Sequence, residues 1–173
     1  MTKSTVRRIK ILSDAEINEL YGLPSFNHAD REDFFSLDDE TQTLVDECRR
    51  LETKCYFILL LGYFRSKPII FNFNFSEVQQ DLEYIEKKYF NGRKVTVPDL
   101  SPTTKTKLSS RLLRYTGYQL YQNKQHKASL LDQLRDVATI SIEPRYVFDE
   151  CIAYFGKQKI ALAGYTTIYR SYY

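Results

Sequence analysis

Apolar residues recur at helical spacing along almost the whole chain, and this period predicts an all-α fold. A capping box at residues 13–16 predicts the start of a first helix, which Gly22 should end. Residues 28–35 indicate a short helix or turn. The next stripe has a spacing of four, three and four residues: Leu44, Cys48, Leu51 and Cys55. It predicts one continuous helix, capped by Asp38 or Asp39, that runs into the apolar segment 57–64.

The segment that follows combines helix breakers with alternating apolar positions. Residues 69–75 are compatible with a short strand and equally with an extended apolar linker packed on the core. Ser76 should then cap a helix over residues 76–90. Its inward positions are Val78, Leu82, Ile85 and Tyr89. Asn91 and Gly92 should end this helix, because both residues tolerate the left-handed conformation found just past a helix end.

Helical patterns continue through the second half of the chain. Ser101 and Pro102 predict a helix start, and Gly117 predicts its end. Further helices are expected over residues 128–138, from Pro144, and from Gly164 onward. We therefore expect two small helical bundle modules, residues 1–95 and 96–173, with helix-turn-helix-like elements. A periodic element that stops at the last residue also predicts that the chain is a fragment of a longer protein.

Charge is distributed unevenly along the chain, and this distribution suggests a function that the helical pattern alone does not indicate. Residues 11–52 carry three positive and twelve negative charges, whereas residues 99–131 carry six positive charges and one negative charge. Residues 1–10 form a basic arm that includes Arg7, Arg8 and Lys10. Such asymmetry indicates a surface that binds a polyanion. Solvated helix faces are the alternative explanation for the same pattern.

The helix that begins at Pro102 is the leading candidate for such a surface. Its apolar face is Leu108, Leu112 and Tyr115, and a basic stripe lies about 100° around the helix: Lys107, Arg111 and Arg114. Thr103 and Ser110 lie beside the stripe. Together with residues 76–90, this helix suggests a helix-turn-helix-like DNA-binding element. The candidate DNA-binding residues are Lys105, Lys107, Ser110, Arg111, Arg114, Lys124, Lys127, Arg93, Lys94, Arg49, Arg50 and Lys54. The last three are expected on the rim of the long helix of the first module.

Catalytic and metal-binding patterns are missing from the sequence. It has no glycine-rich phosphate loop and no nucleophile elbow, and its two histidines, His28 and His126, lie far apart. We expect no catalytic residue, metal or cofactor. Three cysteines in apolar runs predict buried, inert thiols: Cys48, Cys55 and Cys151. The most apolar segment, residues 55–64, is too short to span a bilayer, and the first residues do not form a signal peptide.

Several motifs, in their order and spacing, resemble the amino-terminal region of Tn-three-family transposases. They are residues 11–16 (ILSDAE), 20–24 (LYGLP), 34–37 (FFSL), the pair Arg49–Arg50, residues 59–65 (LLLGYFR), the basic helix that ends in Gly117–Tyr118, and residues 159–167 (KIALAGYTT). The chain departs from the family pattern at Ala163, where proline is usual, and at Leu108, near a frequent histidine.

The resemblance implies sequence-specific binding of double-stranded DNA at transposon terminal inverted repeats. The parent protein would be a replicative, metal-dependent transposase of the prokaryotic cytoplasm, with its catalytic domain outside this fragment. The expected partners are duplex DNA and the remainder of the transposase, with no membrane and no small-molecule ligand. The alternative is a helical protein-interaction module that mediates transposase assembly.

Overall fold

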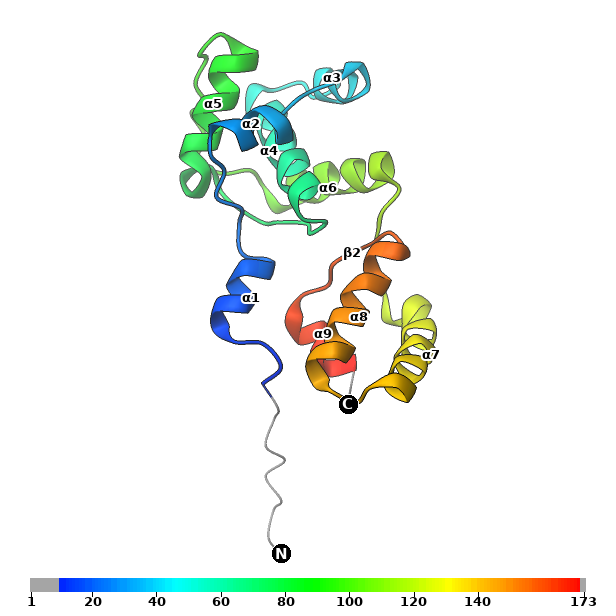
Figure 1. Ribbon diagram of the computed structural model, residues 1–173. Coiled ribbons are helices and arrows are strands. Elements are labelled where there is room, and N and C mark those ends of the chain that lie inside the picture. Colours follow the sequence, from blue (N-terminus) through cyan, green and yellow to red (C-terminus); the bar gives the residue numbers. More distant parts are fainter. Residues whose placement is uncertain (1–9, 172–173) are drawn as a thin grey trace, which may run out of the picture. The chain divides into compact units, whose positions relative to one another are not determined.

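The computed structural model describes residues 10–171, and most of this range is helical (Figure 1). Its elements are α1 (Asp14–Tyr21), α2 (His28–Phe34), α3 (Asp39–Asp46), α4 (Leu51–Ser66), the 3₁₀ helix η1 (Phe75–Val78), α5 (Gln79–Phe90), α6 (Pro102–Thr116), β1 (Gln119–Leu120), α7 (Asn123–Ile140), α8 (Pro144–Lys157), β2 (Ile160–Ala161) and α9 (Tyr165–Ser171). The predicted all-α fold is confirmed. The expected basic arm at Arg7 and Arg8 lies outside the described residues.

The described chain divides into two compact units, each of which is discontinuous in sequence. The central unit comprises residues 23–120 and 159–162, and the terminal unit comprises residues 10–22, 121–158 and 163–171. The predicted modules, residues 1–95 and 96–173, do not match this division. The reason is that α6 packs on α4, which keeps the connector before α6 inside the central unit. A two-residue parallel pairing of β1 with β2 adds residues 159–162 to the same unit.

Helix α4 forms the core of the central unit. Every residue from Cys55 to Phe64 is buried, and α2, α3, α5 and α6 all pack on this helix (Figure 1). Gly62 permits the close approach of α2, because a Cβ at this position would lie 2.3 Å from a ring carbon of Phe35. The all-round apolar character of residues 57–64 therefore corresponds to burial on every side, as predicted.

The predicted continuous helix over residues 39–64 is wrong, because the chain breaks between α3 and α4. Arg50 has extended backbone angles, and the Cys48 amide donates to the Val45 carbonyl at 3.0 Å to close the turn. The break lets Val45 and Cys48 be buried while α4 takes its own direction through the core. Packing thus overrides the local helical period. As a result, Arg49 and Arg50 lie in a turn instead of on the rim of a helix.

Residues 69–74 form an extended linker, η1 begins at Phe75, and the described residues contain no strand at this position. The predicted alternation is present, since Ile69, Phe71, Phe73 and Phe75 are buried and Asn72 is exposed. The expected cap at Ser76 is wrong. Asn74 caps η1 instead, because its side-chain oxygen accepts from the Glu77 amide at 3.1 Å, and α5 follows directly.

All three cysteines are buried and none forms a disulfide. Burial raises the pKa of the Cys48 thiol, and it raises that of Cys55 to about 12. The predicted burial is therefore confirmed, and the raised pKa values keep these two thiols protonated near neutral pH.

The terminal unit is built around α7 and α8, which pack against each other. The predicted inward positions of α7 are all buried: Leu130, Leu134 and Val137. The capping box of α1 is confirmed, since the Ser13 hydroxyl accepts from the Glu16 amide and the Glu16 carboxylate accepts from the Ser13 amide. Glu16 also forms an ion pair with Arg145, which joins α1 to α8 within this unit. These hydrogen bonds, from Ser13 first and then Arg145, lower the pKa of Glu16 to about 2.

Candidate nucleic-acid interface

Helix α6 is defined locally by the residues that the sequence indicated. The Ser101 side chain accepts from the Thr104 amide at 3.2 Å, and Pro102 occupies the first helical position. Gly117 ends the helix with a φ of 72°, in the left-handed region. Leu108 and Leu112 are buried, and α6 packs on α4. The side of α6 opposite Leu108 and Leu112 is therefore exposed to solvent.

Four polar residues form the outer stripe of α6: Thr103, Lys107, Ser110 and Arg114. Their spacing of four, three and four residues aligns them along one side of the helix. All four are exposed. Within the described residues, their side chains have no hydrogen bond or ion pair, and the stripe contains no acidic residue. Two free hydroxyls and two free cations therefore point away from the protein.

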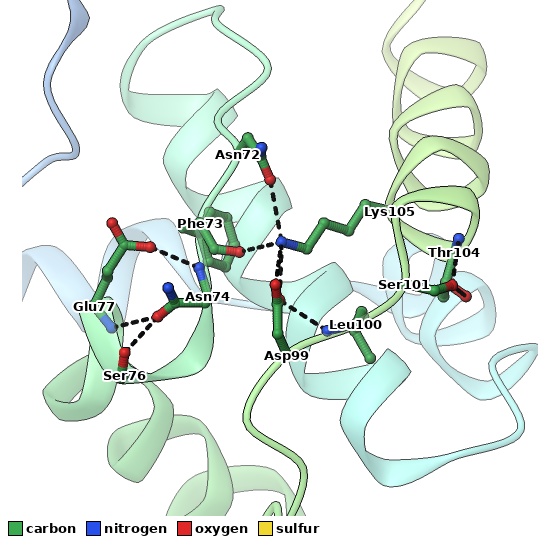
Figure 2. Close-up of polar contacts among 10 residues, drawn as sticks. All are labelled: Asn72, Phe73, Asn74, Ser76, Glu77, Asp99, Leu100, Ser101, Thr104 and Lys105. Atoms are coloured by element: carbon green, nitrogen blue, oxygen red, sulfur yellow. Dashed lines mark hydrogen bonds and ion pairs between the residues drawn. The ribbon is translucent and has the colours of Figure 1, made fainter.

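Lys105 was predicted to bind DNA, but the structure turns it inward (Figure 2). Its Nζ lies 2.8 Å from an Asp99 carboxylate oxygen, and it donates to Asn72 Oδ1 at 3.1 Å and to the Phe73 carbonyl at 2.9 Å. The ammonium also lies 5.7 Å from the ring centroid of Tyr56. Only 15% of the side chain is exposed. Lys105 therefore ties the start of α6 to two preceding segments, and these contacts hold its ammonium group against the protein.

Asp99 is the anionic partner in this network. Partial burial raises the pKa of its carboxyl, but hydrogen bonds from Lys105 and from the Leu100 amide outweigh burial and hold the pKa below its usual range. The Asp99 carboxylate consequently stays ionised near neutral pH. Figure 2 shows that the Asn74 cap of η1 adjoins the same junction, so the linker, the connector and α6 meet at one polar cluster.

Arg111 was also predicted in the basic stripe, and the structure assigns it a largely structural role. One guanidinium nitrogen donates to the Leu44 carbonyl at 3.1 Å and to Cys48 Sγ at 3.4 Å, and it lies 3.7 Å from Glu47. These contacts fasten α6 to the end of α3. The side chain keeps 31% exposure, so it borders the binding face without being free. Of the predicted basic stripe, Lys107 and Arg114 are thus without a partner among the described residues, whereas Arg111 is paired within the protein.

A groove of about 640 Å³ runs between the α3–α4 turn and the first half of α6. This basic groove is lined by Cys48, Arg49, Arg50, Glu52, Thr53, Val97, Asp99, Leu100, Ser101, Thr104, Lys107, Leu108 and Arg111. It brings together two sets of cations that are far apart in sequence. Arg49 has no partner among the described residues, and Arg50 has only a long ion pair, 3.8 Å, with Glu52. Hence two nearly free arginines lie across the groove from Lys107.

The other predicted cations of the central unit contribute less. Lys54 lies 3.7 Å from Asp46 and is only 25% exposed. Lys94 lies 2.8 Å from Glu86, whose hydrogen bond raises the pKa of Lys94. Glu86 is buried and also accepts from the Val95 amide at 2.7 Å, so this pair closes the loop after α5. Arg93 is exposed but belongs to this loop and does not line the basic groove.

Lys124 and Lys127 are exposed on α7, which belongs to the terminal unit. They do not line the basic groove. Their closeness to α6 in sequence therefore gives no reason to group them with the outer stripe. They remain candidate cations of a separate unit.

Two kinds of site are missing from the part of the chain that the structure describes. Residues 10–171 contain no group of three or more His, Cys, Asp or Glu side chains placed to hold a metal ion. Among the same residues, no helix has both the length and the apolar character needed to cross a membrane.

The fold and the face of α6 define an all-α protein with a basic helical surface. By sequence, the chain belongs to the family described as Domain of unknown function (DUF4158), whose model matches residues 11–172. No curated protein and no solved structure matches the chain.

Proposed function

We propose that the central unit binds double-stranded DNA through the outer stripe of α6 and the adjoining basic groove. The observation that carries this proposal is the outer stripe itself. It presents two unpaired cations and two unpaired hydroxyls along one side of α6, and the opposite side of this helix is buried. Lysine, arginine, serine and threonine are the side chains that most often contact DNA phosphates. Arg49 and Arg50 extend the same positive surface across the groove.

The dimensions of α6 support a duplex as the ligand. The helix has 15 residues, which corresponds to a length of about 22 Å at 1.5 Å per residue. The major groove of B-DNA is about 12 Å wide and admits one α-helix. Because Leu108 and Leu112 hold the inner face of α6 on α4, the outer stripe is presented on a rigid support.

The resemblance to Tn-three-family transposases supports a more specific role. In this role the chain recognises the terminal inverted repeats of a transposon as the amino-terminal part of a replicative transposase. Its partners are then the transposon ends and the remainder of the transposase. In this proposal the chain binds DNA without catalysing a reaction and without a cofactor.

A protein-interaction module is the second candidate, and one observation favours it. Ile140 and Ile142, at the turn between α7 and α8 of the terminal unit, are 75% and 84% exposed. The two residues lie two positions apart in the chain, and exposed apolar residues that form a contiguous patch are typical of contact surfaces between proteins. This function would involve the terminal unit, so it does not conflict with DNA binding by the central unit.

Salt dependence distinguishes the two functions. Binding of the chain to a fluorescent duplex of random sequence should weaken steeply with salt, because each cation–phosphate contact releases counterions. The exposed cations of the outer stripe and the basic groove, Lys107, Arg114, Arg49 and Arg50, predict a slope of roughly −3 to −4 in log K against log salt concentration. An affinity that does not change with salt would exclude this mode of binding.

A further inference from the structure

We infer that the cations of the outer stripe and the basic groove have two roles: Arg114 reads a guanine in the major groove, and Lys107, Arg49 and Arg50 contact phosphates. This inference rests on the proposed function and adds a specificity-determining residue to it. Neither charge nor sequence position alone separates these cations. Their surroundings in the structure do.

Lys107 belongs to the phosphate-contacting set because of its neighbours. It lines the basic groove together with Arg49, Arg50 and Arg111. A DNA strand that follows this groove would meet several cations within one short stretch of backbone. An ammonium acts on phosphate as a point charge without a required orientation, so lysine is suited to this position.

Arg114 has different surroundings. It does not line the basic groove, and no carboxylate within the described residues pairs with it. Ser110 lies one turn earlier on the same side of α6, and its small side chain allows the helix backbone at this turn to approach base edges. A guanidinium placed there presents the planar fork that binds guanine O6 and N7 with two hydrogen bonds. Arg114 differs in this respect from the other described cations that were predicted to bind DNA. Those cations lie in the basic groove, in loops, in ion pairs or on α7.

The rigid mounting of α6 makes base reading feasible. Lys105 fixes the start of the helix through Asp99, Asn72 and the Phe73 carbonyl (Figure 2). Arg111 fixes its middle through the Leu44 carbonyl. Lys105 and Arg111 would otherwise add non-specific affinity for DNA. Their contacts with the protein instead fix the orientation of α6. Side chains that read bases need such support, since small displacements remove directional hydrogen bonds.

Charge-conserving substitutions test the inference. A preferred duplex is first selected from random sequences with the whole chain, and the dissociation constants of this duplex and of all its single-base-pair variants are then measured. Arg114→Lys should reduce the preference at one guanine position by roughly 5- to 150-fold, because the ammonium lacks the two-pronged fork. Its affinity for unselected DNA should change by no more than about twofold, because the charge is kept. The matched control, Arg49→Lys with Arg50→Lys, should keep the full preference profile.

The possible results distinguish the role of Arg114 in base reading from DNA binding by the central unit as a whole. A profile that is unchanged in Arg114→Lys, or one that is lost in the Arg49/Arg50 control, would overturn the division between base reading and phosphate binding. Salt-dependent binding of the wild type without any sequence preference would also overturn it, while leaving DNA binding intact. An absence of salt-dependent binding in the wild type would refute both proposals. Thermal unfolding of each variant checks that the exposed substitutions leave the fold unchanged.

Discussion

Replacing Arg49, Arg50, Lys107 and Arg114 together with alanine is expected to weaken duplex binding by roughly 10²- to 10³-fold at about 0.1 M salt. These residues are the exposed cations of the α6 surface and have no close acidic partner. Loss of these four positive charges, three of which are assigned to phosphates, should also reduce the steepness of the salt dependence by about three units of slope. Fluorescence anisotropy over a range of salt concentrations measures both effects. Stability should change little, since exposed substitutions usually stay within about 0.5 kcal/mol each.

Lys105→Met is the control within the same helix. It removes a positive charge from α6, but that charge is held by Asp99, Asn72 and the Phe73 carbonyl and does not face solvent. We expect the salt slope to stay at the wild-type value and the free energy of unfolding to fall by about 1–3 kcal/mol. Lys124→Ala with Lys127→Ala is the control in the terminal unit. If this double variant loses as much affinity as the quadruple variant, the binding surface lies on α7 instead.

Asp81→Ala is expected to lower the free energy of unfolding by about 3–5 kcal/mol. One carboxylate oxygen of Asp81 accepts from Arg31 Nε at 2.6 Å, and the other accepts from the Tyr63 hydroxyl at 2.6 Å. Both charged side chains are largely buried, with exposures of 9% for Asp81 and 17% for Arg31. The substitution would remove the anionic partner of the largely buried Arg31 guanidinium and the acceptor of the buried Tyr63 hydroxyl. Burial is also the main cause of the raised pKa of Tyr63.

Asp46→Ala is the matched control for Asp81→Ala, because it also removes an aspartate from an ion pair of the central unit. The Asp46 side chain is 61% exposed and lies 3.7 Å from Lys54, so its removal should cost no more than about 1 kcal/mol. Urea unfolding followed by circular dichroism measures both variants. Equal effects of the two substitutions would mean that the Asp81 network contributes no more than a surface ion pair.

The helical elements could be predicted from the sequence because their signals are local. Ser13 with Glu16, Ser101 with Pro102, and Gly117 each specify a helix end through hydrogen bonds or backbone angles within a few residues. The break between α3 and α4 has no such signal. It contains neither glycine nor proline, and it follows from the packing of α3 against α4, which depends on the tertiary fold.

The candidate site was predicted only in part, because a side chain's partners are not visible in a helical pattern. The spacing placed Lys107, Arg111 and Arg114 on one stripe, yet Arg111 turns to a carbonyl 67 residues earlier in the chain. Lys105 is likewise held by residues of another segment, 32 and 33 positions earlier. The basic groove was missed for the same reason, since Arg49 and Arg50 meet α6 only in the folded chain. The unusual Lys105–Asp99 spacing, six residues across a helix start, is the one sequence feature that hints at the inward lysine.

Amide chemical-shift mapping can locate the DNA-binding surface of the central unit without any substitution. A duplex is added in steps to the isotopically labelled chain, and the shifted backbone amides are assigned. We expect shifts along the outer stripe, from Thr103 to Arg114, and at Arg49 and Arg50 in the α3–α4 turn. Shifts confined to α7 and α8, or no shifts at a salt concentration that permits binding, would contradict the assignment of DNA binding to the central unit.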